Sequence, residues 1–99
     1  MKIENSYWTF ITNHGRVFVF IAKNPRTTTR TIAQEVEVTE RTVQNIIADL
    51  EKEGYIVKHR EGRNNYYEIH PEMPMRHPME KEHLVSNLLV ALGCTLEKK

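Results

Sequence analysis

The stretch IAQEVEVTERTVQNIIADLEKEGYI, residues 32–56, contains two runs in which apolar residues recur at the three- and four-residue spacing of an amphipathic helix. Only Glu37, Val38 and Thr39 separate the two runs. So short a connection forces the second helix to cross the first at a steep angle. We therefore predict that the apolar face of the first helix holds the second, and that the polar face of the second projects outward.

Local signals predict where these two helices begin and end. Thr28 or Thr29 can cap the first helix and Thr39 the second, because a threonine hydroxyl accepts a hydrogen bond from exposed backbone N–H groups at a helix start. Gly54 suits the C-terminal end of the second helix. The predicted core residues of the pair are Ile32, Ala33, Val36, Val43, Ile46, Ile47 and Leu50.

After Gly54 the apolar period changes towards the period of two that is typical of strands. The runs 55–60 and 65–70 are β-prone, and the EGRN between them supplies Gly and Asn where a hairpin turn needs positive φ. Tyr66 and Tyr67 are expected to be one packed and one half-exposed strand residue. The element order predicts a mainly α fold with a small β-hairpin: a winged helix-turn-helix domain over residues 1–70.

A longer helical region, residues 6–23, precedes this pair. Its predicted buried stripe comprises Phe10, Ile11, His14, Val17, Phe18 and Ile21. Gly15 weakens the helix, so the region can also form two pieces that break near Asn13, with Asn13 capping the second. Asn24-Pro25 ends it. His14, on the apolar stripe, is expected to be a satisfied core residue.

Residues 71–99 form the other predicted unit, a proline-rich connector followed by an added C-terminal helix. This helix is predicted over residues 79–92, with Pro78 at its first turn. Its apolar stripe comprises Leu84, Val85, Leu88, Leu89 and Leu92. The stripe can pack on the first helical region of the same chain. We favour a homodimer interface shared with that region and with Tyr7, Trp8 and Phe10, because one small core leaves little surface to cover it.

The overall composition narrows the class of protein. A chain of 99 residues suits one small domain, and a formal net charge of +1 excludes a globally basic nucleic-acid coat but not a local basic patch. The single Cys94 cannot form an internal disulfide, which favours a reducing compartment. No apolar run approaches the roughly 18 residues of a membrane span, and the N-terminus lacks a signal peptide's apolar segment. We therefore expect a soluble cytoplasmic protein with no membrane partner.

The outer face of the second helix, residues 39–53, carries residue types that read bases in the major groove of double-stranded DNA. Arg41 can make two hydrogen bonds with guanine, and Gln44 or Asn45 with adenine. Glu40 can accept from a cytosine amino group, pair with a cation, or stabilise the helix start against the dipole. Acidic residues gather instead at the far end of this helix.

Hydroxyls and the hairpin complete the predicted interface. Thr39 and Thr42 can hold phosphates, and Arg63 at the hairpin tip can enter a narrow minor groove. The wing that approaches the minor groove or the backbone is predicted over residues 58–66. The full predicted DNA-binding set is Thr28, Arg30, Thr39, Glu40, Arg41, Thr42, Gln44, Asn45, Lys58, Arg60, Arg63 and Asn65.

These residues resemble the winged helix-turn-helix of the MarR and ArsR type of transcriptional regulators. The resemblance lies in Ala33 of the first helix, Thr42-Val43 early in the second, and the exit Leu50-Glu51 and Gly54-Tyr55-Ile56. The stretch REGRNNYYEI is similar to the acidic-x-Arg wing tip of those regulators. The resemblance implies a dimeric DNA-binding regulator. One departure is Glu37, where the family usually has Gly: if this residue adopts positive φ, it costs on the order of 1 kcal/mol.

The Met- and His-containing stretch 70–83 could suit a soft metal, and its ligand candidates are His70, Met73, Met75, His77, Met79 and His83. However, no Cys-x-Cys is present, and His77 and His83 do not share a helix face. We therefore expect no metal and no cofactor, and methionines that fill core gaps. Nothing near Cys94 indicates a reactive thiol.

No nucleophile motif, phosphate loop or ligand cluster indicates an enzyme. The predicted function is a sequence-specific DNA-binding transcriptional regulator, by analogy a repressor. The sequence identifies no small-molecule effector. The alternative is a winged-helix module that binds protein or RNA, and neutralising Arg41 and Arg63 would separate the two.

Overall fold

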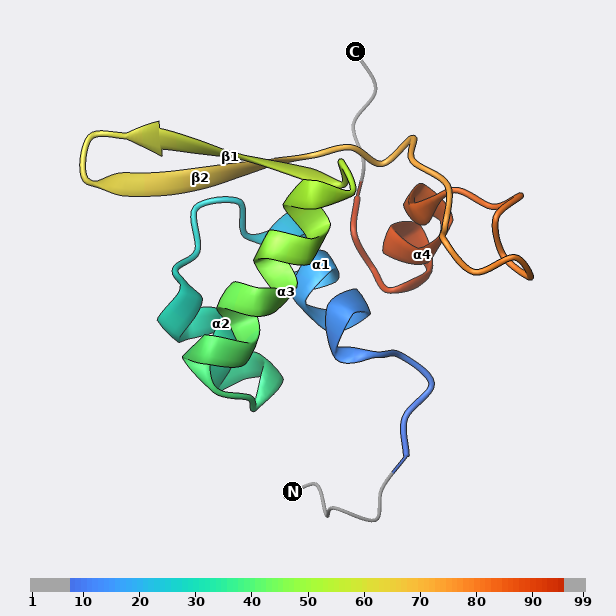
Figure 1. The fold of residues 1–99 in the computed structure, drawn as a ribbon, viewed down its shortest axis with the longest axis horizontal. Helices are drawn as coiled ribbons and strands as arrows, with labels where there is room; N and C mark the ends of the chain where they lie inside the picture. Colours follow the sequence, from blue (N-terminus) through green and yellow to red (C-terminus); the bar gives the residue numbers. More distant parts are fainter. Residues whose placement is uncertain (1–7, 96–99) are drawn as a thin grey trace.

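The computed structural model describes residues 8–95 and shows three helices, a β-hairpin and a short fourth helix in sequence order (Figure 1). The hairpin projects to one side of the helices, and the last helix lies on the opposite side. The elements are α1 (Asn13–Lys23), α2 (Thr29–Val36), α3 (Glu40–Lys52), β1 (Ile56–Glu61), β2 (Asn64–Ile69) and α4 (Val85–Ala91). The predicted winged helix-turn-helix fold with an added C-terminal helix is confirmed.

Helix α1 begins later than the sequence predicts. Its N-cap is Thr12, whose hydroxyl accepts a hydrogen bond from the Gly15 N–H at 3.1 Å, and the predicted cap Asn13 is the first helical residue. Residues 8–12 lie outside any helix, so Phe10 leaves the predicted stripe and is 89% exposed. Ser6 and Tyr7 lie outside the described residues.

The helix-turn-helix has the predicted caps. The hydroxyls of Thr28 and Thr39 accept from the backbone N–H groups of Thr31 and Thr42. Glu37 adopts the left-handed conformation, with φ 67° and ψ 48°, and its N–H donates to the Ala33 carbonyl at 2.8 Å. The turn therefore requires a conformation that usually favours glycine, and the chain meets this requirement with glutamate.

The wing is an antiparallel pair in which Ile56 faces Ile69 and Glu61 faces Asn64. Both strands begin and end within one residue of the predicted ranges. The two central turn residues are Gly62 and Arg63, and only Gly62 has positive φ (64°), so the prediction of a left-handed Asn in this turn is wrong. Glycine at the first central position suits a tight hairpin turn whose second residue has ordinary φ.

The C-terminal segment differs most from its prediction. Helix α4 has 7 residues and starts at Val85, whereas the predicted helix starts at residue 79. The backbone N–H groups of Val85 and Ser86 donate to the carbonyls of Met73 and Pro71, at 2.8 and 3.0 Å. These bonds hold the chain against the proline-rich connector, so residues 79–84 form turns and a bridge rather than a helix.

One core joins all of these elements. The residues that are at most 1% exposed are Val17, Ile21, Ile32, Val43, Ile56 and Leu89. They come from α1, α2, α3, β1 and α4, so the C-terminal segment shares the core of the winged helix. No helix within residues 8–95 is long and apolar enough to cross a bilayer.

Candidate nucleic-acid interface

Helix α3 separates an apolar inner face from a polar outer face. Val43, Ile46, Ile47 and Leu50 are all less than 9% exposed, because they contact the core. The other face is solvent-exposed and presents Glu40, Arg41, Gln44 and Asn45. The inner residues fix the helix against α1 and α2, so the outer side chains stand on a rigid support.

The predicted threonines divide into different roles. The Thr39 hydroxyl accepts from the Thr42 N–H and donates to the Thr42 hydroxyl, both at 3.0 Å. Thr28 makes the same two bonds with Thr31, both at 3.1 Å. The oxygens of Thr28 and Thr39 therefore stabilise helix starts, while the Thr42 hydroxyl keeps its own proton for another acceptor.

Exposed cations lie on α2, on α3 and on the wing. Within residues 8–95, no carboxylate forms an ion pair with Arg30, Arg41, Lys58 or Arg63. The guanidinium of Arg60 donates from Nε to the Gly62 carbonyl at 2.9 Å, which ties it to the wing turn. Asn65 lies half-buried in β2 opposite Arg60. The structure thus places the predicted residues on α2, α3 and the wing.

Sequence patterns did not predict that Arg26 and several wing residues contact one another. Arg26, in the loop between α1 and α2, pairs with Glu61 and lies 5.0 Å from the ring centroid of Tyr66. His59 stacks on the same ring at 4.9 Å and contacts the Glu68 carboxylate at 2.9 Å. Arg26 and Glu61 are 35 positions apart, so no sequence spacing indicates their contact.

The opposite end of α3 is acidic, and two of its carboxylates have partners. Asp49 contacts the exposed imidazole of His14 at 2.8 Å, and Glu53 lies 3.9 Å from Arg76. His14 is therefore a surface residue with an acidic partner, and its prediction as a core residue is wrong. The charges along α3 change from exposed Arg41 near one end to paired carboxylates at the other.

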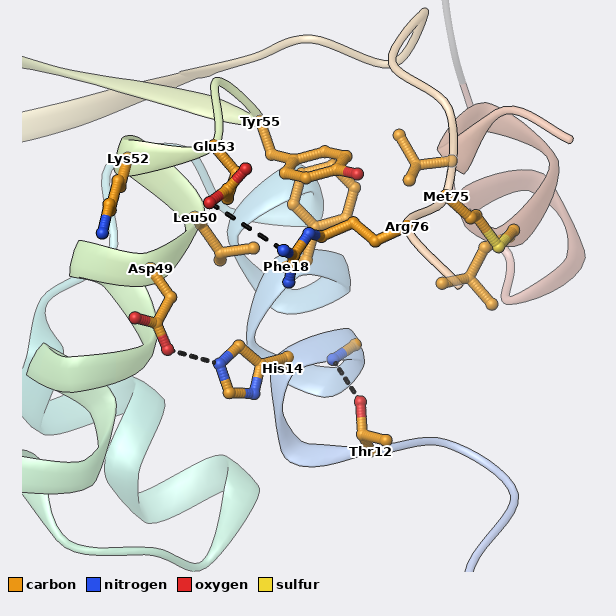
Figure 2. Close-up of a pocket in the computed structure, with 13 residues that line it drawn as sticks. Thr12, His14, Phe18, Asp49, Leu50, Lys52, Glu53, Tyr55, Met75 and Arg76 are labelled. Atoms are coloured by element: carbon orange, nitrogen blue, oxygen red, sulfur yellow. Dashed lines mark hydrogen bonds and ion pairs between the residues drawn. The ribbon is translucent and has the colours of Figure 1, made fainter. Parts of the chain in front are cut away.

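A cavity of about 410 Å³ lies beside this acidic end, between α1, α3 and the C-terminal segment. Its walls include the apolar side chains of Phe18, Leu50 and Leu88. Figure 2 shows the two ion pairs that flank it, His14 with Asp49 and Arg76 with Glu53. Its size suits a small organic molecule, and none of the outer-face residues Glu40, Arg41, Gln44 and Asn45 lines it.

Two buried tyrosines support the wing from beneath. Burial raises the pKa of the Tyr67 phenol, and the charge of Glu51 raises it further. Burial also raises the pKa of Tyr55, which Arg76 lowers and Glu53 raises to smaller extents, and the Tyr55 hydroxyl donates to the Pro74 carbonyl at 2.5 Å. Tyr67 is the packed and Tyr66 the half-exposed residue of the pair, as predicted.

The predicted dimer residues do not share one face. Val85 and Leu89 are 7% and 0% exposed because they pack in the chain's own core, so their prediction as interface residues is corrected. Leu88 is half-buried beside the 410 Å³ cavity. Leu84 and Leu92 remain 41% and 38% exposed.

Two histidines of the Met- and His-containing stretch have local partners. His70 contacts Glu72 at 3.3 Å, and His77 accepts from the Met79 N–H at 3.0 Å. Met73 and Met75 pack against the core, as predicted for core-filling methionines, but Met79 is 84% exposed and the prediction is wrong for it. Within residues 8–95, no group of three or more His, Cys, Asp or Glu side chains could hold a metal ion.

The fold, the exposed face of α3 and the wing define a winged helix-turn-helix protein, the class that binds DNA and regulates transcription. The HTH domain family matches residues 17–68, and the chain belongs to this family. The match contains the two helices, their turn and nearly the whole wing. No curated protein sequence matches the chain.

Among solved structures, the chain is similar to MepR, a transcription regulator of the Staphylococcus aureus multidrug efflux pump MepA, with a TM-score of 0.53 and 19% identity. The similarity covers 60% of this chain and 46% of the MepR chain, so this chain matches less than half of that protein. The family match confirms the predicted helix-turn-helix, and the similarity to MepR confirms the predicted winged-helix fold.

Proposed function

We propose that the protein is a sequence-specific regulator that binds double-stranded DNA as a homodimer, with residues 39–53 in the major groove and the wing, residues 58–66, at the minor groove or backbone. The observation that carries the proposal is the outer face of α3. Arg41, Gln44 and Asn45 are exposed there on a helix whose opposite side is locked in the core. A groove about 12 Å wide accepts such a helix.

The wing supplies the second contact. Lys58 and Arg63 are exposed and have no ion pair within residues 8–95, so their charge is available to phosphates. Such contacts release counterions, and binding is therefore expected to weaken as salt increases. The acidic end of α3 is expected to face away from the phosphates.

An apolar face away from α3 supports the homodimer. Trp8 and Phe10 are 75% and 89% exposed and pack edge to face with ring centroids 5.0 Å apart. Phe10 also lines a groove that contains Phe20, Val36 and Leu92. A projecting aromatic pair beside a groove with apolar walls suits a two-fold interface, in which each pair would pack against the groove of the partner.

The position of this face suits a regulator. None of the residues that line the groove comes from α3 or from the wing, so two copies joined there keep both recognition helices free. A two-fold dimer binds near-palindromic sites whose halves lie about one DNA turn apart. We propose that occupation of such a site in a promoter represses transcription, that the protein acts in the cytoplasm, and that it catalyses no reaction.

The test is a selection from random duplex DNA with the purified protein, followed by binding of the enriched site at two salt concentrations. We expect a near-palindromic motif that binds much more tightly than random duplex. Arg41→Ala and Arg63→Ala together should abolish this preference. Equal weak binding to all sequences would instead favour the module that binds protein or RNA.

The dimer is tested separately by sedimentation of Phe10→Glu. We expect this variant to be monomeric and to bind half-sites without the cooperative gain from a full site. Met79→Glu is the matched control, because Met79 is 84% exposed and lies outside the groove. A monomeric wild-type chain, or a dimer that Phe10→Glu leaves intact, would exclude this interface.

A further inference from the structure

We propose that Arg26 is a positioning residue for the wing: it sets the wing's orientation through Glu61 and Tyr66 and does not itself bind DNA. This inference rests on the proposed function. It gives a role to a cluster that the proposed DNA contacts of α3 do not use: Arg26, His59, Glu61, Tyr66 and Glu68.

Arg26 is placed to hold both strands of the wing at once. It lies in the loop between α1 and α2, outside the hairpin. Its guanidinium pairs with Glu61, the last residue of β1, and lies 5.0 Å from the ring centroid of Tyr66 in β2. A single side chain therefore connects the loop between α1 and α2 to the two strands near the wing turn.

The same loop holds the wing through its backbone. The Tyr67 N–H donates to the Pro25 carbonyl at 2.9 Å. This bond and the buried side chains of Ile56 and Tyr67 secure the base of the wing, but the turn lies well beyond the helices (Figure 1). An isolated two-stranded hairpin is marginally stable, so the outer part of the wing needs a further contact to keep one direction.

The Tyr66 ring is a firm support for Arg26. His59 stacks on it with an interplanar angle of 19°, and His59 is itself held by Glu68 at 2.9 Å. Arginine over an aromatic face within about 6 Å is attracted by the ring quadrupole. Arg26 therefore meets an ordered ring rather than a free side chain.

Charge explains why Glu61 is tolerated next to Arg63. A lone carboxylate at the wing tip would repel the phosphates that Arg63 is proposed to approach. Its pairing with Arg26 offsets this repulsion. Because the two side chains are 66% and 56% exposed, the pair contributes little to the free energy of unfolding, and its effect is expected in wing geometry instead.

Glu61→Gln gives the decisive test, because the two explanations predict opposite signs. If charge alone matters, removing a carboxylate from the wing tip tightens binding to the selected duplex. If Glu61 positions the wing through Arg26, the same variant weakens binding, by about fivefold or more, which is the lower range for a lost groove contact. Tighter binding by Glu61→Gln would overturn the proposal.

Two further variants separate positioning from direct contact. Arg26→Gln should weaken binding as Glu61→Gln does, and the exchange Arg26→Glu with Glu61→Arg should restore most of the affinity. An Arg26 that bound phosphate directly would not be restored by the exchange. Glu53→Gln is the matched control, since Glu53 pairs with Arg76 at the other end of α3 and its loss should not weaken binding.

The free protein provides a readout that needs no DNA. In Arg26→Gln we expect lower ¹⁵N heteronuclear NOE values for the amides of Gly62 and Arg63, and an unchanged Tm. An unchanged wing would exclude the proposal even if the protein binds DNA as described. If Arg26→Gln loosens the wing but the wild-type chain shows no duplex preference, Arg26 still positions the wing and the proposed function is rejected.

Discussion

Helices α3 and α4 both pack apolar residues on the core, but they present opposite chemistry to solvent. Helix α3 has 13 residues, a threonine cap at Thr39 and a polar outer face. Helix α4 has 7 residues and no side-chain cap bond, and it leaves Val90 60% exposed next to Leu92. The buried faces indicate only that both helices belong to the fold. The exposed faces separate a surface suited to base edges from one suited to protein.

The largest effect is expected at Leu89, where a substitution tests whether α4 packs in the chain's own core. If α4 belongs to the chain's own core, Leu89→Ala should lower the free energy of unfolding by about 2–5 kcal/mol, because Leu89 is fully buried and its removal leaves a cavity. Urea denaturation at two protein concentrations measures this and separates unfolding from dissociation.

The neighbouring Val90→Ala is the control on the same helix. Val90 is 60% exposed, so its truncation should change the free energy of unfolding by less than about 0.5 kcal/mol. If both variants lowered the free energy of unfolding equally, and in a way that depends on protein concentration, α4 would instead form an interface between two chains.

The next largest effect is expected on the outer face of α3. Arg41→Ala should weaken binding to the selected duplex by about 1–3 kcal/mol and relax the preference at one base pair, because Arg41 is exposed and can bond guanine. Fluorescence anisotropy with matched and mismatched duplexes measures both changes.

Lys52→Ala removes the same charge from the other end of α3, beside the acidic residues. We expect it to leave the base preference unchanged. If Lys52→Ala and Arg41→Ala weakened all duplexes equally, α3 would contribute only general electrostatic attraction.

A smaller effect is expected at the turn that leads into α3. Glu37→Gly should raise the free energy of unfolding by about 1 kcal/mol, because glycine adopts the left-handed conformation at φ 67° without a Cβ clash. Thermal denaturation measures the change. Glu35→Gly, inside α2, should instead cost about 1 kcal/mol. A loss of stability in both variants would show that Glu37 bears no strain.

The smallest effect is expected on the free energy of unfolding at alkaline pH, through the two buried tyrosines Tyr67 and Tyr55. The folded state raises the pKa of Tyr67 and Tyr55 above the ordinary value of 10.0. Between that value and the raised pKa, the unfolded chain loses phenol protons that the folded chain keeps, so stability should fall as the pH rises above 10. Urea denaturation at pH 9 and 10.5 tests this. Tyr67→Phe should reduce the dependence, and an unchanged slope would exclude Tyr67 as its source.

The sequence predicted the helix-turn-helix well because local signals agree there. Thr28 and Thr39 cap helices whose apolar spacing matches their buried faces. The departure at Glu37 was recognised, although two turn conformations remained possible until the structure showed positive φ. The wing followed from its alternation and from Gly62, whose freedom at positive φ the turn requires.

The C-terminal segment was predicted less well because tertiary hydrogen bonds decide it. Pro78, as a residue suited to a first helical turn, suggested a helix from residue 79, but α4 starts at Val85, whose N–H donates to the Met73 carbonyl. The predicted interface failed in part for a related reason: Val85 and Leu89 fill a core that the winged helix does not complete alone. The contact of Arg26 with Glu61 has no local pattern and needed the fold.

The bridge between Pro74 and Leu84 also has a consequence for engineering. The Met75 N–H donates to the His83 carbonyl at 3.0 Å, so the two ends of the exposed loop at residues 77–82 are held together. Lengthening a loop whose ends are fixed adds entropy cost only slowly. A peptide tag or a fluorescent domain inserted between Glu80 and Lys81 should therefore leave the fold intact. Such an insertion would report the protein's location in living cells with both chain ends unmodified.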